Sequence, residues 1–163
     1  MKNRYLLFIG ILFLSLTNMA LASTENLDRY QLKFSESNPK VVGITATLLV
    51  RDKKLEMASW GHALHLKESW SHFVKNLSAR LQDGTPLDID KVEGAEWKID
   101  VPDDTLVNLH YEVNLSHSDH DWTSGGGDDA RPEWTGQNHF LVSKALFIIS
   151  YKENSESTVA FDV

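Results

Sequence analysis

The stretch LHYEVNL, residues 109–115, decides the fold of this chain. Its apolar residues occupy every second position, and His110, Glu112 and Asn114 fill the positions between them. Successive side chains of a β-strand point to opposite faces, so this alternation predicts a strand with one face on a core and the other toward solvent. Such half-buried strands are typical of antiparallel sheets.

The same alternation recurs on both sides of this stretch. It covers residues 30–34, 44–50, 77–81 and 97–101, and we expect a final strand at 157–163. Turn-forming sequences separate the runs, among them DGTP at 83–86, EG at 93–94 and PDD at 102–104. Short strands at regular spacing indicate two packed sheets. We therefore predict an all-β fold, an antiparallel β-sandwich with at most one short helix.

Three segments depart from the alternation. Residues 64–74 mix apolar and polar side chains and predict a helical turn around Glu68 to Trp70. Residues 116–138 are irregular and rich in Gly, Asp and Trp, which predicts a long loop. Residues 140–151 form an apolar run that we interpret as a strand rather than a short helix, because its residues 147–149 are aromatic or β-branched.

The first 22 residues have the pattern of a secretory signal peptide. Lys2 and Arg4 precede an apolar run at residues 5–16, and Ala20 and Ala22 give the small-x-small cleavage pattern. A membrane-spanning helix needs about 20 apolar residues, and this run is shorter; a retained N-terminal anchor is the alternative. We expect cleavage after Ala22 and export, periplasmic or secreted. The predicted β-sandwich domain then covers residues 23–163, with no membrane contact after cleavage.

Composition excludes several classes of protein. The 163 residues include 16 basic and 23 acidic side chains, a formal charge of −7, and no cysteine. An acidic surface repels phosphate backbones, so we predict no nucleic-acid partner. Without cysteine the chain has no disulfide, thiolate metal site or cysteine nucleophile.

The histidines do not form a recognisable catalytic or metal motif. No His-Glu-x-x-His is present, as a zinc peptidase would require, and His62 and His65 would share a face only on a helix. His117 and His120 lie near several aspartates, but the calcium-loop template fails at its sixth and twelfth positions, Ser124 and Ala130. A looser metal site in this segment is the alternative to a solvated acidic loop.

Nucleophilic catalysis has equally little support. Ser71 precedes His72, and serines flank His117, but no Gly-x-Ser-x-Gly elbow presents a hydroxyl. We therefore predict no catalytic, metal or cofactor-binding residues, no cofactor, and no enzymatic activity. A metal-assisted hydrolase that uses His117 and His120 is the least favoured hypothesis.

Two tryptophans of the irregular segment stand out. Trp97 alternates into a strand and is expected in the core, whereas Trp122 and Trp134 lie in the predicted loop with Asp128 and Asp129. A loop aromatic needs something to pack against. We predict a binding loop of these four residues, which packs on the sandwich or docks to a partner; stacking on a sugar ring is the alternative.

An ordered set of motifs resembles the N-terminal domain of the glycyl aminopeptidase family of zinc metallopeptidases, peptidase family M61. The motifs are WSHFVKNLSA at 70–79, DGTPL at 83–87, EWKI at 96–99, LHYEV at 109–113 and ALFI at 145–148. The resemblance spans about residues 27–163. It implies a β-sandwich accessory domain that packs beside a catalytic unit.

The departures from the family pattern shape the functional hypotheses. Family members typically continue into a domain with the His-Glu-x-x-His zinc site, which this chain lacks, and Trp60-Gly61-His62 lacks the proline of a common family element. We expect an exported, non-catalytic accessory domain, truncated before the catalytic domain, that binds a protein partner or the missing domain and self-associates. A stand-alone sugar- or peptide-binding β-sandwich module is the alternative.

Overall fold

The centre of the structure is an antiparallel pair of ten-residue strands, β2 (Val41–Val50) and β8 (Thr105–Asn114). Their register is continuous, from Val41 opposite Asn114 to Val50 opposite Thr105. The computed structural model describes residues 28–117, 131–150 and 157–162. The alternation predicted for residues 109–115 and 44–50 is confirmed, because their apolar side chains are buried.

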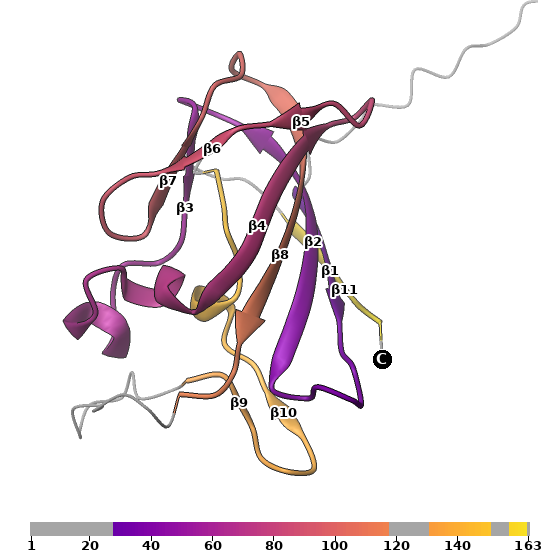
Figure 1. Cartoon of the computed structure of the whole chain (residues 1–163), viewed down its shortest axis with the longest axis vertical. Coiled ribbons are helices and arrows are strands. Elements are labelled where there is room, and N and C mark those ends of the chain that lie inside the picture. Colours follow the sequence, from indigo (N-terminus) through magenta and orange to yellow (C-terminus); the bar gives the residue numbers. More distant parts are fainter. Residues whose placement is uncertain (1–27, 118–130, 151–156, 163) are drawn as a thin grey trace, which may run out of the picture.

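Four further strands extend this pair into a six-stranded sheet with the order β11-β1-β2-β8-β4-β5 (Figure 1). The added strands are β1 (Asp28–Lys33), β4 (Val74–Leu81), β5 (Pro86–Leu87) and β11 (Ser157–Asp162). The DGTP sequence closes the β4–β5 hairpin as predicted, with the Leu81 N–H donating to the Thr85 carbonyl at 2.9 Å.

One row of inward-facing side chains crosses all six strands. Directly opposed partners lie on the same face of a sheet, so the pairing places these residues side by side. In sheet order they are Val159, Tyr30, Ala46, Leu109, Ala79 and Leu87. Burial is complete in the middle of the row and partial at its two ends. The core therefore lies under the centre of the sheet.

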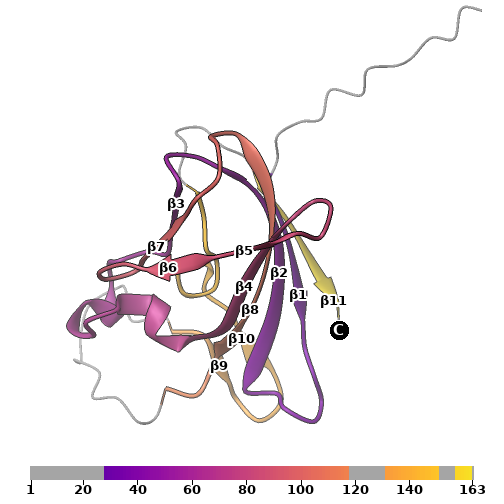
Figure 2. The same ribbon diagram turned by 45° about the horizontal axis from the view of Figure 1, so that its top comes forward.

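A three-stranded sheet forms the second layer (Figures 1 and 2). It has the order β3-β7-β6, with β3 (Lys54–Glu56), β6 (Ile89–Lys91) and β7 (Glu96–Ile99). Leu55, Trp97 and Ile99 are buried from this side and join the same core as the large sheet. The two-layer β fold is thus confirmed, and Trp97 is a core residue as predicted.

Three short 3₁₀-helices and a two-stranded hairpin complete the described structure. They are η1 (His62–His65), η2 (Ser69–Phe73) and η3 (Ser143–Ala145), and the hairpin strands are β9 (Glu133–Trp134) and β10 (His139–Phe140). The helical turn predicted around Glu68 to Trp70 corresponds to η2. Among the described residues no helix is long and apolar enough to cross a membrane.

Three expectations need correction. The strand predicted over residues 140–151 is not formed in its described part, residues 140–150: β10 ends at Phe140, η3 follows, and a single bridge joins Ile149 to Glu56. The loop predicted over 116–138 contains β9 in its described part. The final strand exists, but it pairs with β1 in parallel, so the sheet is mixed. Alternation tells which face a side chain occupies, but it does not tell the direction of the neighbouring strand.

Candidate functional site

Trp134 is the member of the predicted binding loop that the structure describes. Trp122, Asp128 and Asp129 fall in residues 118–130, outside the described residues. Trp134 lies on β9 directly opposite His139 of β10. The two ring centroids are 4.6 Å apart and the planes are tilted by 41°. The tryptophan is therefore packed against a neighbouring ring in this fold.

The turn between the two strands fixes this ring pair. The Thr135 N–H donates to the Asn138 carbonyl at 3.0 Å, and the Asn138 N–H donates back to the Thr135 hydroxyl at 3.1 Å. Gly136 has φ of +95°, a conformation that favours glycine because it has no Cβ. A hairpin closed in this way holds Trp134 and His139 on the same face.

Phe34 packs against His139 and extends the pair to three rings. Its centroid lies 4.5 Å from that of His139. The His139 Nε2 is 2.8 Å from the Pro39 carbonyl, and a carbonyl only accepts, so this nitrogen carries the hydrogen. The Phe34 N–H donates to the Asp162 carbonyl at 3.3 Å. The ring contacts thus join β9, β10 and the residue that follows β1, and the Phe34 backbone is hydrogen-bonded to β11.

These rings border a hollow of about 630 Å³, which we call the aromatic hollow. Pockets that bind small molecules typically have volumes of about 300–1,000 Å³. Its lining residues are Phe34, Ser35, Glu36, Pro39, Trp134, Gln137, His139, Leu141 and Phe161. Phe161 is 60% exposed, so a large apolar surface is left open to solvent at this place. Among the described residues of the lining, Glu36 carries a charge and none is Lys or Arg, which favours a neutral or cationic ligand.

The His117 ring packs against aromatic side chains of η2. Its ring centroid lies 4.1 Å from that of Phe73 and 6.3 Å from that of Trp70. Its Nε2 lies 3.0 Å from the Asn114 carbonyl. His120 and the neighbouring aspartates of the predicted acidic group are outside the described residues.

The structure also places the other histidine pair. His62 and His65 both belong to η1, where His65 is exposed; the His62 side chain is outside the described part. Within residues 28–117, 131–150 and 157–162, no three His, Cys, Asp or Glu side chains are grouped so that they could hold a metal ion.

Ser71 hydrogen-bonds with Lys91 rather than with His72. The Lys91 Nζ donates to the Ser71 Oγ at 2.7 Å, and this hydroxyl donates to the Glu68 carbonyl at 2.7 Å. Burial lowers the pKa of Lys91, whose ammonium also lies 4.2 Å from the centroid of the Trp97 ring. Ser71 is only 4% exposed, so its hydroxyl joins β6 to η2 and is closed to a substrate.

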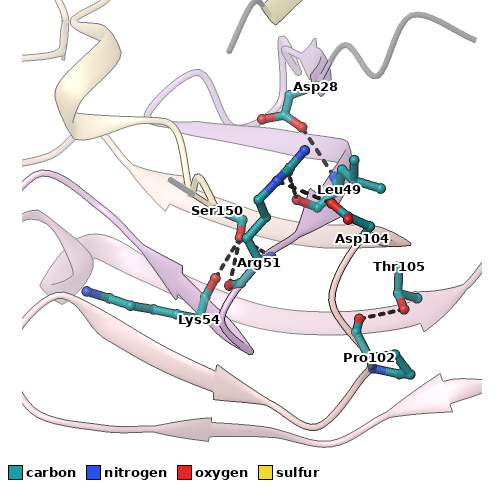
Figure 3. A network of polar contacts seen from close by, with 8 residues as sticks. All are labelled: Asp28, Leu49, Arg51, Lys54, Pro102, Asp104, Thr105 and Ser150. Atoms are coloured by element: carbon teal, nitrogen blue, oxygen red, sulfur yellow. Dashed lines mark hydrogen bonds and ion pairs between the residues drawn. The ribbon is translucent and has the colours of Figure 1, made fainter. Parts of the chain in front are cut away.

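A polar network at one end of the sheet serves the fold (Figure 3). The Arg51 N–H donates to the Ser150 Oγ at 2.7 Å, and this hydroxyl lies 2.9 Å from the Lys54 carbonyl. The Arg51 side chain donates to the Leu49 carbonyl at 2.9 Å and pairs with Asp104 at 3.3 Å. These contacts join residue 150 to the β2–β3 turn.

Asp28 is the buried acid beside this network. One carboxylate oxygen accepts a hydrogen bond from the Leu49 N–H at 3.2 Å. Burial raises the pKa of Asp28 against the opposing influence of that hydrogen bond and of the Arg51 charge. The carboxylate does not line the aromatic hollow.

The sequence singled out Trp134 but not the residues around it. Phe34 directly follows β1 and Phe161 lies on β11, and the parallel pairing of these two strands brings both residues to the hairpin. His139 had a local signal: TGQN at 135–138 is a turn-forming sequence between short apolar runs. That signal would have placed His139 opposite Trp134.

The comparisons with known proteins agree with this architecture. A solved aminopeptidase N family protein from Idiomarina loihiensis superposes with a TM-score of 0.57 at 15% identity, over 75% of this chain. At this identity the likeness is one of fold alone. The chain corresponds to only 19% of the length of that protein.

The fold is thus that of a β-domain also found within a much larger protein. The family model described as Peptidase M61 N-terminal domain matches residues 29–163, so the chain belongs to this family. This confirms the resemblance inferred from the ordered motifs. No curated protein matches the chain.

Proposed function

We propose that this chain is an exported, non-catalytic accessory domain of a peptidase and that it acts by contacting a catalytic unit. The observation that carries the proposal is the family match, which extends over the whole described β-sandwich. The catalytic unit is the zinc domain that the family resemblance implies.

We further propose that the aromatic hollow and β11 form the docking surface. Apart from the partly buried Val159, every β11 side chain is exposed, which is unusual for a strand in a six-stranded sheet. β11 is also an edge strand, and exposed edges are commonly covered by another chain or segment. The exposed Phe161 joins the two features, because it lies on β11 and lines the hollow.

A binding measurement with two matched phenylalanine variants tests this surface. Phe161 and Phe140 are both exposed, at 60% and 48%, but only Phe161 lines the aromatic hollow. The purified chain is titrated by calorimetry with the zinc domain of a family member. We expect Phe161→Ala to weaken binding about tenfold or more, as for a buried aromatic anchor, and Phe140→Ala to leave it nearly unchanged. Equal effects would contradict docking at this surface.

Activity and export need separate measurements. We expect no peptide hydrolysis by the purified chain with zinc added, and turnover that copurifies with the chain would overturn the non-catalytic role. The export proposal is supported by the pattern of residues 1–22, which are outside the described part of the chain. N-terminal sequencing of the protein recovered from an expressing cell should then begin at Ser23.

Self-association is part of the same proposal. Several large apolar side chains are more than one-third exposed; they are Trp60, Leu64, Val92, Leu106, Phe140 and Phe161. Among them Phe161 adds to the apolar lining of the aromatic hollow, and apolar patches that are open to solvent mark interaction sites. We expect the isolated chain to form dimers or larger species at high concentration in sedimentation experiments, and Phe161→Ala to reduce them.

The size of the aromatic hollow favours a second candidate, a free-standing sugar- or peptide-binding module. Flat rings of Trp134 and Phe34 beside the Glu36 carboxylate suit stacking and hydrogen bonding to a neutral polar ligand. In this case the chain alone binds a glycan or peptide on an array, and Trp134→Ala abolishes the signal. The accessory role instead requires binding to the zinc domain and no array signal.

A further inference from the structure

A second hollow, about 650 Å³ in volume, lies between the end of β3 and the η3 segment, and we call it the Lys144 hollow. Its lining residues are Glu56, Met57, Ala58, Ser59, Trp60, Val142, Ser143, Lys144, Phe147 and Ile149. None of them lines the aromatic hollow. Most of the lining is apolar, with two serine hydroxyls and one charge of each sign.

The positive charge lies above an exposed tryptophan. The Lys144 Nζ is 4.4 Å from the centroid of the Trp60 ring, and this tryptophan is 55% exposed. Among the described residues no Asp or Glu carboxylate lies within ion-pair distance of this ammonium. The cation–π contact orients the ammonium but leaves its charge unneutralised.

Gly61 allows this arrangement. A Cβ at residue 61 would lie 2.9 Å from the Lys144 Nζ, closer than real contacts permit. Its φ of +85° is a second reason for glycine at this position. The lysine therefore extends across a backbone that has no side chain in its way.

The negative charge of the lining has a partner outside the hollow. The Glu56 carboxylate pairs with the Lys54 Nζ at 2.6 Å, and Lys54 is shared with Glu96, at 2.8 Å. An anionic ligand in the hollow thus meets, among the described residues, an ammonium without a carboxylate partner on one side and a paired carboxylate on the other.

Both walls of the hollow are fixed by buried side chains. On one wall the indole N–H of the fully buried Trp70 donates to the Trp60 carbonyl at 3.1 Å. On the other the Tyr111 hydroxyl donates to the Leu146 carbonyl and the Tyr30 hydroxyl to the Ile148 carbonyl, both at 2.9 Å. A preformed site loses little conformational freedom when a ligand binds.

We propose that the Lys144 hollow binds a ligand that has a carboxylate attached directly to an apolar body. The carboxylate pairs with Lys144, and the body packs between Trp60 and the apolar side chains of Met57, Phe147 and Ile149. The apolar C-terminal residue of a peptide has this chemistry, and so does a free aryl- or alkyl-carboxylic acid. This site is independent of the docking surface proposed above.

The test compares two probes that differ only in charge. N-acetyl-L-phenylalanine and its C-terminal amide are titrated into the ¹⁵N-labelled chain, and the Trp60 indole cross-peak is followed by NMR. A charge-assisted hydrogen bond is roughly twice as strong as a neutral one, so we expect the acid to bind about tenfold more tightly than the amide. Higher salt should reduce this ratio, because Lys144 is near the surface.

Three lysine variants separate a specific contact from a general charge effect. We expect Lys144→Met to abolish the preference for the acid and Lys144→Arg to keep it. Lys33→Met removes the same charge from an exposed position on β1, away from the hollow, and should change nothing. Circular dichroism checks that each variant is folded. Titration with 3-phenylpropionate, which has the carboxylate and the ring but no amide, shows whether binding requires the peptide amide.

Four outcomes would overturn the proposal. They are equal binding of acid and amide, an unchanged preference in Lys144→Met, loss of the preference in Lys33→Met, and no shift of the Trp60 cross-peak up to the solubility of the acid. Binding of 3-phenylpropionate as well as N-acetyl-phenylalanine supports a site for carboxylic acids in general. Binding of N-acetyl-phenylalanine alone supports a site for peptide C-termini.

Discussion

The β2–β8 pair and the segment 141–150 both place apolar side chains in the core but satisfy their backbones differently. Ile44 and Val113 are fully buried on the paired strands, and Ile148 is fully buried in the segment. On the strands a continuous ladder satisfies the backbone. In the segment the Tyr111 hydroxyl donates to the Leu146 carbonyl and accepts from the Ile148 N–H at 3.2 Å.

This difference shows that burial alone does not make a strand. Buried backbone groups need partners, and side-chain hydroxyls can replace a ladder when they reach the right place. Tyr30 and Ser150 act in the same way as Tyr111, at the Ile148 carbonyl and the Arg51 N–H. Burial raises the pKa of both tyrosines, so their hydroxyls stay protonated and able to donate. Hydroxyl contacts of Tyr30, Tyr111 and Ser150 therefore hold the segment in place, together with the backbone bridge between Ile149 and Glu56.

The largest expected loss of stability comes from a substitution in the paired strands. Ile44 lies between Leu32 and Tyr111 in the sheet and is completely buried. Ile44→Ala should lower the free energy of unfolding by about 3 kcal/mol, through lost burial and the cavity left behind. Urea unfolding measures this loss. Thr45→Ala, at the exposed neighbouring position, should cost less than about 0.5 kcal/mol, and an equal cost would contradict the assignment of faces.

The next largest expected loss of stability comes from removing the Tyr111 hydroxyl, which serves the backbone of the segment 141–150. Tyr111→Phe keeps the ring but removes a partner from two buried backbone groups, at Leu146 and Ile148. We expect a loss of about 2 kcal/mol, because a buried group left without its hydrogen bond costs about 1–3 kcal/mol. Hydrogen exchange should show faster exchange in residues 145–150 than in β2 and β8.

Tyr30→Phe sharpens this result as a matched control. The Tyr30 hydroxyl serves one backbone group, the Ile148 carbonyl, where the Tyr111 hydroxyl serves two. We therefore expect a loss of about 1 kcal/mol, half that of Tyr111→Phe. Equal losses would mean that the Ile148 N–H contact contributes nothing to stability.

The regularly paired strands are the part of the molecule that the sequence predicts well. Alternation at 44–50, 97–101 and 109–115 depends only on the geometry of a strand, and these runs are buried as expected. The strand prediction for residues 140–151 was wrong, because apolar residues indicate burial but do not indicate which groups form hydrogen bonds with the backbone. Those groups are hydroxyls at Tyr30 and Tyr111, far away in the sequence.

The candidate sites show the same limit. Trp134 stands out as an aromatic in an irregular segment, but the hollow around it also needs Phe34, which follows β1, and Phe161 of β11, and the parallel pairing of these strands brings the two together. The Lys144 hollow had no local signal, because its lysine and Trp60 are distant in sequence and meet only after both walls are anchored. Spacing along the chain predicts local structure; long-range hydroxyl contacts and strand direction decide the hollows.

The smallest expected effect is on the pH dependence of stability, and it comes from Asp28 at the start of β1. Burial raises the pKa of Asp28 above its ordinary value of 3.8. The folded state therefore holds this proton more tightly than the unfolded state, and stability falls as pH rises from about 3.8 through the folded pKa. Asp28→Asn keeps an oxygen for the Leu49 N–H and removes this ionisation.

Urea unfolding at several pH values between about 4 and 7 checks the sign. The stability of Asp28→Asn relative to the wild type should increase as pH rises. Asp100→Asn is the control with the opposite sign, because the exposed Asp100 pairs with Lys53 at 2.7 Å, which lowers the pKa of Asp100. That pair stabilises the fold at higher pH, so the relative stability of Asp100→Asn should decrease as pH rises. A flat profile for Asp28→Asn would mean that the pKa of Asp28 is the same in the folded and the unfolded chain, and a slope of the same sign as that of Asp100→Asn would mean that folding lowers this pKa; either result would contradict the prediction.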